Sequence, residues 1–166
     1  IYSGYSTFRD EVLEVDQYLT KMEKTVSDQF GALHKFTWDL CAHAACVELD
    51  ADVLTEAITE LVSNAVNATP AGGTIQISTR WSEQETGDWS TIVVSVTDTG
   101  TGMAQETMAK AREPFFTTRE VGQGMGLGLS FVDGIARIAG GELRMTSETG
   151  KGTIAEMHLP AKWTSD

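Results

Sequence analysis

The chain has 166 residues, of which 41% are hydrophobic and 22% charged, a composition typical of one folded domain rather than of a disordered chain. Its formal net charge of −12 argues against nonspecific binding to nucleic acid or to an anionic membrane, although backbone amides can still bind phosphate locally. No apolar run approaches the roughly 20 residues needed to cross a bilayer. The two cysteines, Cys41 and Cys46, are too few for a disulfide framework and favour a reducing compartment, so we expect a cytoplasmic location. Because the chain begins at Ile1 and not at Met, we also expect a longer protein, in which any membrane anchor would lie upstream.

Residues 1–33 carry the clearest periodicity of the chain. Apolar residues are spaced alternately by four and three positions, and they are Ile1, Tyr5, Phe8, Val12, Val15, Leu19, Met22 and Val26. This heptad repeat predicts a helix that forms a coiled coil or a helical-bundle dimer, whereas the alternative is a helix that packs on its own domain. We therefore predict a dimerisation or linker segment at 1–33 and a second domain at 34–166.

Beyond residue 33, helical and strand patterns alternate. The expected strands span 36–40, 46–49, 74–81, 91–98, 142–147 and 152–159, and the expected helices span 54–65 and 128–139. Asp50 or Asp52 is the expected N-cap of the first of these helices. Two consecutive glycines end the second helix, and a hairpin turn at 149–152 joins the last two strands.

The first segment with chemical character is the helical segment 60–68. Its residues Glu60, Asn64 and Asn67 or Ala68 share one helix face. A carboxylate beside two amides suits a hydrated divalent cation and phosphate oxygens, because Mg²⁺ keeps several waters and takes few protein ligands. Taken alone, the face is more simply interpreted as a solvated polar surface.

The second segment, 98–103, directly follows a β-branched strand. A buried carboxylate at Asp98 can accept a hydrogen bond from an exocyclic amine, and Gly100 and Gly102 let the backbone pass close to a flat ring. Adenine carries that amine and guanine does not, so an analogue without the donor would leave the carboxylate unpaired. Without further support this segment is an ordinary turn.

The third segment contains glycines at alternate positions, Gly122, Gly124, Gly126 and Gly128, before a helix. These glycines permit close approach of the backbone, and the unpaired N–H groups of the helix N-terminus attract phosphate. A dinucleotide-binding loop and a Walker loop are both rejected. The preceding segment 113–119 reads as a loop rather than a strand, and no Gly-Lys-Ser/Thr motif is present.

In this order, the segments resemble the ATP-binding domain of the gyrase, histidine kinase and MutL superfamily, and specifically the catalytic domain of a sensor histidine kinase. Segments 60–68, 98–102, 113–119 and 124–128 resemble the N, G1, F and G2 boxes, and Gly152-Thr153 resembles the closing glycine–threonine pair. The match extends over 47–160, and the F box Glu113-Pro-Phe-Phe116 distinguishes histidine kinases from gyrase-type relatives. The resemblance implies an α+β fold, a two-layer α/β sandwich of the Bergerat type in which a mixed sheet packs on helices. It also implies transfer of the γ-phosphoryl group of ATP to a histidine.

The resemblance further implies a role for each matching residue. Asn64 would hold Mg²⁺ against the phosphates, Asp98 would read the adenine amine, and Thr153 would help through a water. Gly100, Gly102 and Met103 would lie beside the ring. Arg119 and the backbone of Gly124, Met125, Gly126, Leu127 and Gly128 would contact phosphate from a mobile lid, which Phe115 and Phe116 would anchor.

Two positions depart from the usual pattern of the family. Glu60 stands where histidine kinases often have Asn, and it could act as the base that prepares the phosphate acceptor. Asn67 stands where relatives often carry a charged residue, so its contact with phosphate or metal has less support than that of Asn64.

None of the three histidines, His34, His43 and His158, lies in the acidic-then-proline context of a phosphorylated histidine. We therefore expect the chain to bind ATP without labelling itself, with the acceptor on a partner helix and a response regulator downstream. We expect a homodimer through residues 1–33. Two alternatives remain: an anti-sigma-factor-type serine/threonine kinase, and a non-catalytic nucleotide-binding signalling module. The complete F box argues against the first, and the presence of Asn64 and Asp98 argues against the second.

Overall fold

The computed structural model describes residues 10–86, 89–102 and 128–163, and in this part of the chain seven strands form one sheet. The strands are β1 (Asp10–Glu14), β2 (Lys35–Cys41), β3 (Ala45–Asp50), β4 (Thr74–Thr86), β5 (Trp89–Asp98), β6 (Glu142–Glu148) and β7 (Gly152–Trp163). The helices are α1 (Val15–Phe30), α2 (Ala51–Ala68) and α4 (Gly128–Ile138). Every element predicted beyond residue 33 is present, with ends that shift by a few residues.

The strands follow the order β1-β3-β7-β5-β4-β2, and β6 also pairs with β7. The sheet is mixed, because β2 and β4 run parallel while the other neighbours are antiparallel. Strand β5 lies between β4 and β7, and its residues from Ile92 to Val96 are all buried. All of these residues except Ser95 are apolar, as suits a strand in the middle of the sheet, and Asp98 lies at the carboxyl end of β5.

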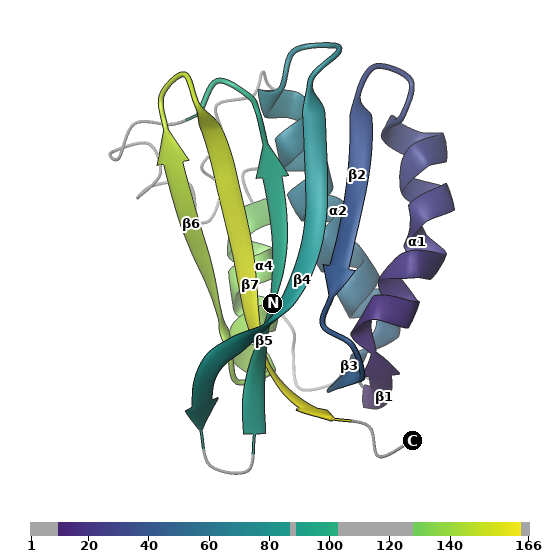
Figure 1. Ribbon diagram of the computed structural model, residues 1–166, viewed down its shortest axis with the longest axis vertical. Coiled ribbons are helices and arrows are strands. Elements are labelled where there is room, and N and C mark those ends of the chain that lie inside the picture. The colour runs from purple at the N-terminus through teal and green to yellow at the C-terminus, as the bar shows by residue number, and fades with distance from the viewer. Residues whose placement is uncertain (1–9, 87–88, 103–127, 164–166) are drawn as a thin grey trace.

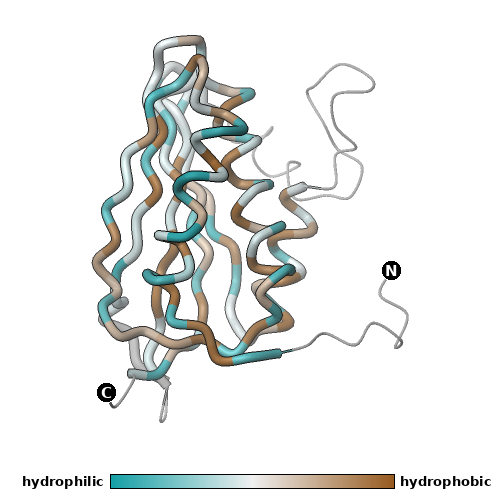
Figure 2. Tube along the Cα trace, turned by 90° about the vertical axis from the view of Figure 1, so that its right-hand side faces the viewer, coloured by the Kyte–Doolittle hydropathy of each residue, from teal (hydrophilic) through white to brown (hydrophobic). Residues whose placement is uncertain are grey.

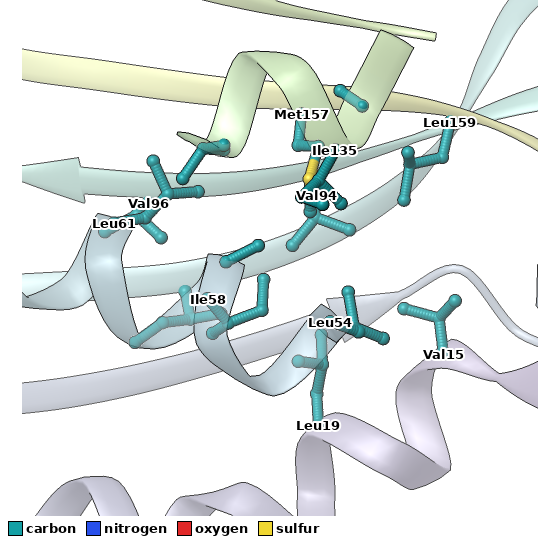
Figure 3. Close-up of a cluster of buried hydrophobic side chains, with 14 of the residues drawn as sticks. Val15, Leu19, Leu54, Ile58, Leu61, Val94, Val96, Ile135, Met157 and Leu159 are labelled. Atoms are coloured by element: carbon teal, nitrogen blue, oxygen red, sulfur yellow. The ribbon is translucent and has the colours of Figure 1, made fainter. Parts of the chain in front are cut away.

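The helices cover one face of this sheet, so the domain has two layers (Figures 1 and 2). Leu54, Ile58 and Leu61 recur at helical spacing along α2 and are buried. They face Val94 and Val96 of β5 (Figure 3). Burial of each such side chain stabilises the fold by about 1.5–3 kcal/mol. None of the helices in the described ranges combines the length and the apolar character that a membrane span requires.

The predicted N-terminal helix is wrong at Asp10–Glu14, which forms strand β1 and pairs antiparallel with β3. Within this strand Leu13 is buried while Val12 is 66% exposed, because neighbouring side chains of a strand point to opposite faces of the sheet. The helix begins only at Val15. Within the described residues the heptad repeat therefore holds only from Val15 onwards, and Val12 fits its spacing without being part of the helix.

Helix α1 packs on its own domain, as in the alternative interpretation of the heptad pattern. The seam residues Val15, Leu19, Met22 and Val26 are buried in the same hydrophobic core as the residues of α2 and the sheet. Figure 3 shows Val15 and Leu19 beside Leu54. These four side chains are therefore covered and cannot also form the seam of a coiled-coil dimer. The earlier seam positions, up to Phe8, lie outside the described residues.

Polar contacts also fix α1 in place. The Tyr18 hydroxyl donates to the carbonyl oxygen of Ala51 at 2.9 Å, which joins α1 to the first turn of α2. The buried Thr79 hydroxyl donates to Asp16 Oδ1 at 2.6 Å and accepts from the backbone N–H of Cys41 and of Ala42. One hydroxyl thus ties α1, β2 and β4 together.

Candidate nucleotide-binding site

Helix α2 starts at a well-formed N-cap. Asp50 Oδ1 accepts from the backbone N–H of Asp52 at 2.9 Å and of Val53 at 3.3 Å, which satisfies two donors of the first turn. The prediction of an N-cap at Asp50 or Asp52 is confirmed at Asp50. The cap and the buried apolar face together fix the rotation of α2, and so decide where its polar face points.

That polar face meets the first residue of α4. A Cβ atom added to Gly128 would lie 2.5 Å from Glu60 Oε2 and 3.4 Å from Asn64 Nδ2. The structure therefore brings together Glu60, Asn64 and Gly128, three residues that the sequence placed in one site. A carboxylate at this point is favourable in itself, because a helix N-terminus carries partial positive charge.

The end of α2 contributes a backbone group rather than the side chain of Asn67. Asn67 is exposed, and its Nδ2 donates to the Ser63 carbonyl oxygen at 2.9 Å. By contrast, the carbonyl oxygen of Ala68 accepts from the backbone N–H of Thr101 at 3.1 Å. The contact between α2 and the loop after β5 thus runs through Ala68, and a ligand role for Asn67 stays a prediction.

Asp98 is buried at the end of β5, with 6% of its surface exposed. Its Oδ1 accepts from the backbone N–H of Gly100 at 2.9 Å and of Thr153 at 3.2 Å. Burial raises the pKa of this carboxyl, and the two backbone hydrogen bonds lower it in part. Within the described residues both bonds go to Oδ1, so Oδ2 keeps its capacity to accept a proton from a ligand.

The loop after Asp98 is clasped by the turn between β6 and β7. Gly102 has a φ of +68°, and a Cβ there would lie 2.0 Å from the carbonyl oxygen of Glu148. Gly152 has a φ of +106°, and a Cβ there would lie 2.1 Å from the carbonyl oxygen of Asp98. The backbone N–H of Gly150 donates to the Thr101 carbonyl oxygen at 2.6 Å. Only glycine fits at the two close approaches, which explains both motif glycines physically.

Thr153, whose backbone N–H donates to Asp98, is 8% exposed. Its Oγ1 is 2.7 Å from Ser147 Oγ, and Ser147 Oγ also donates to the Gly152 carbonyl oxygen at 3.2 Å. Ser147 was missed in the sequence, because a serine inside a predicted strand carries no motif. The cross-strand register that places it opposite Thr153 could have revealed it.

The remaining predicted site residues lie outside the described part of the chain. They are Met103, Phe115, Phe116, Arg119, Gly122, Gly124, Met125, Gly126 and Leu127. Their roles stay predictions.

A cavity of about 700 Å³ lies elsewhere, between β3, the end of α4 and the neighbouring parts of β6 and β7. Val47, Ile138 and Pro160 are among its lining residues, and the predicted site residues are not. This cavity is therefore separate from the candidate nucleotide site.

The structure thus has a mixed sheet covered by helices on one face (Figure 2), with a buried carboxylate at the end of its central strand. Residues 49–162 match the model of the family described as "Histidine kinase-, DNA gyrase B-, and HSP90-like ATPase". The chain belongs to this family, and the resemblance proposed from its motifs is confirmed.

Known relatives agree with this assignment. The chain is 34% identical over 170 residues to "Sensor kinase CckA" of Brucella abortus (strain 2308), covering 96% of this chain and 18% of that protein. Its fold is similar to full-length ShkA in complex with AMPPNP, with a TM-score of 0.79, 22% identity and coverage of 96% of this chain and 32% of that chain. It is also similar to the catalytic domain of histidine kinase ThkA, with a TM-score of 0.76, 23% identity and coverage of 92% and 95%.

The two structural similarities show the fold, and they confirm the predicted two-layer α+β architecture. The chain spans only 18% and 24% of the length of the first two curated relatives. The matched part corresponds to the catalytic ATP-binding domain of sensor histidine kinases.

Proposed function

We propose that this chain transfers the γ-phosphoryl group of ATP to a histidine on a partner helix, as the catalytic domain of a two-component sensor histidine kinase. The observation that carries the proposal is the buried Asp98 carboxylate, held by the N–H groups of Gly100 and Thr153 in a member of this ATPase family. An acceptor oxygen that the described residues leave without a donor, in a buried place, suits the amino group of adenine and rejects a purine that presents an oxygen there. We also propose that the domain is cytoplasmic, because ATP is available there.

The convergence of Glu60 and Asn64 at Gly128 supports a second half of the site, for magnesium and phosphate. A carboxylate and an amide oxygen are hard oxygen donors, and a site with few protein ligands matches the preference of Mg²⁺. The residues therefore fit the ion, and Asn64 would hold it. When bound, Mg²⁺ supplies charge neutralisation at the transferring phosphoryl group.

Glu60 would accept the proton during transfer. The imidazole nitrogen of the acceptor attacks the γ-phosphorus, the bond from that phosphorus to the ADP oxygen breaks, and the imidazole proton passes to the Glu60 carboxylate. The N-terminus of α4 beside Glu60 adds partial positive charge where the phosphate would lie.

The acceptor histidine is expected on another polypeptide segment. His34 Nε2 is 2.8 Å from the Thr69 carbonyl oxygen, and His158 is a buried residue of β7. Neither lies on a helix, and His43 lies in the turn between β2 and β3. The partners that we propose are therefore a helix carrying the acceptor histidine and a response regulator.

The proposal is tested by calorimetry with ATP and Mg²⁺, followed by incubation with γ-labelled ATP, alone and with the phosphoacceptor domain of a sensor histidine kinase. We expect binding, no label on this chain, and acid-labile, base-stable label on the acceptor. Acid-stable label would favour the serine/threonine kinase alternative. Absence of ATP binding would favour the non-catalytic module, and acid-labile label on this chain would show that it carries its own acceptor.

A further inference from the structure

We propose that Ser147 fixes the Thr153 hydroxyl as a hydrogen-bond acceptor in the adenine site, and so acts as a positioning residue that favours 6-amino over 6-oxo purine nucleotides. The inference rests on the proposed function, because it concerns how the same site selects its base. Ser147 lies in β6, outside the motifs that the sequence revealed.

The register of the last two strands places these side chains together. Ser147 of β6 is the direct antiparallel partner of Thr153 of β7, so both side chains stand on the same face of the sheet. That face is the one covered by the helices, since Leu143 and Met157 on it belong to the core. The two hydroxyl oxygens are 2.7 Å apart, a normal distance for an O–H···O hydrogen bond.

The direction of this hydrogen bond follows from the neighbouring contact. Each hydroxyl has one proton to donate, and a carbonyl oxygen can only accept. Ser147 Oγ donates to the Gly152 carbonyl oxygen at 3.2 Å, so the Ser147 proton is engaged there. Either hydroxyl can donate in the contact between them, and with the Ser147 proton placed on the Gly152 carbonyl oxygen we assign Thr153 as the donor to Ser147 Oγ. Thr153 Oγ1 is left with lone pairs only, and so with the ability to accept.

The Thr153 hydroxyl and the carboxylate of Asp98 are then both hydrogen-bond acceptors. Thr153 donates its backbone N–H to Asp98 Oδ1 at 3.2 Å, and both residues are at least nine-tenths buried. Asp98 and the Thr153 hydroxyl therefore both offer acceptors, and the backbone hydrogen bond links their two residues. A water that donates to both of them has its lone pairs left for the 6-amino group of adenine. The carbonyl oxygen of a 6-oxo purine would meet acceptors instead.

Replacement of Ser147 by alanine frees the Thr153 proton. The threonine hydroxyl can then rotate and donate toward the site, which removes part of the discrimination against an oxygen at purine position 6. The close approaches between the hairpin turn and the Asp98 loop use backbone atoms of Gly152 and Glu148. Ser147→Ala removes a hydrogen bond to the Gly152 carbonyl oxygen but leaves these backbone approaches in place. A change in base preference is thus separable from a loss of structure.

The test measures the dissociation constants of ATP and of inosine triphosphate, which differs from ATP at position 6, by calorimetry in the presence of Mg²⁺. We expect Ser147→Ala to lower the preference for ATP over inosine triphosphate by about 2- to 10-fold, the range of one neutral hydrogen bond. Ser147→Thr keeps a hydroxyl and should retain the preference. Thr146→Ala, the neighbouring exposed residue of β6, is the matched control and should also retain it.

The inference would be overturned if Ser147→Ala weakened the binding of ATP and of inosine triphosphate equally, or changed the affinity for neither. If Ser147→Ala does not fold, Thr153→Val supplies the same test, because it removes the acceptor itself and should likewise reduce the preference for ATP. Binding of neither nucleotide by the wild-type chain would overturn the proposed function itself, and the two failures are therefore distinguishable.

Discussion

At the scale of single residues, Asp98 shows how burial and ligand recognition are linked. The carboxylate is buried at the end of the central strand, and the two backbone N–H groups that bind it in the described part of the chain both donate to the same oxygen. A buried carboxylate with spare acceptor capacity weakens the fold and strengthens binding of a matching donor. Glu60 and Asn64 lie instead at the start of α4. Substitutions in the two halves of the site should therefore affect ATP binding and phosphoryl transfer to different extents.

The first prediction concerns this division of labour. Asp98→Asn should weaken ATP binding by about 5- to 100-fold, because an amide N–H would replace an acceptor oxygen opposite the adenine amine. Asn64→Ala should instead reduce magnesium-dependent phosphoryl transfer more than it reduces ATP binding. Calorimetry and a transfer assay on the two variants provide the measurement. Equal effects of both substitutions on both quantities would refute separate adenine and magnesium roles.

The second prediction concerns pH. Burial raises the folded-state pKa of Asp98 above its ordinary value of 3.8, so the folded chain binds this proton more readily than the unfolded chain. The associated stabilisation is fully present below the unfolded pKa and is lost as pH rises through the folded pKa. The unfolding free energy of Asp98→Asn minus that of wild type should therefore increase from acid to neutral pH. Urea denaturation at a series of pH values measures this difference, and a constant difference would contradict the raised pKa.

At the scale of elements, the hairpin of β6 and β7 holds the Asp98 loop by backbone contacts. Gly102 lies against Glu148, and Gly152 lies against the carbonyl oxygen of Asp98. Neither contact involves a flexible side chain that could move aside. The position of Asp98 is therefore set by a turn more than fifty residues later in the sequence.

The third prediction compares two glycines of this turn. Gly150 and Gly152 both have positive φ, +83° and +106°, so alanine at either position carries a backbone penalty of about 1–2 kcal/mol. A Cβ at Gly150 meets no atom within 4 Å, whereas one at Gly152 would lie 2.1 Å from the Asp98 carbonyl oxygen. Gly152→Ala should therefore destabilise the domain more than Gly150→Ala and should weaken ATP binding more. Thermal unfolding and calorimetry test both points. Identical stability and ATP affinity of the two variants would show that the close approach of Gly152 to Asp98 contributes to neither.

Sequence patterns predicted those features that depend on local chemistry. The N-cap at Asp50 and the strand ending at Asp98 follow from residue type and periodicity, and both are present. The strand at Asp10–Glu14 was missed because Val12 also fits the heptad spacing that continues into α1. The contact of Gly102 with Glu148 and the pairing of Ser147 with Thr153 arise only when β6 and β7 meet the Asp98 loop. Such contacts depend on tertiary packing, and no local pattern encodes them.

At the scale of the whole molecule, α1 belongs to the ATP-binding domain. A repeat of four and three residues fits both a coiled-coil seam and a helix on a core, and the spacing alone does not decide between them. The structure covers the seam with α2 and the sheet, and a buried hydroxyl of β4 holds Asp16 in the first turn of α1. The core is therefore continuous across the boundary that the sequence suggested near residue 33.

The last prediction tests this continuity. Leu19 is 0% exposed, so Leu19→Ala should lower the free energy of unfolding of the entire domain by about 2–5 kcal/mol. That loss is a large part of the roughly 5–15 kcal/mol typical of a folded domain. Val12→Ala, at a position that is 66% exposed, should change it by no more than about 0.5 kcal/mol. Urea denaturation followed by circular dichroism, together with sedimentation, separates the two models. A separate dimerisation helix would instead lose association in Leu19→Ala while the ATP-binding part unfolded as in the wild type.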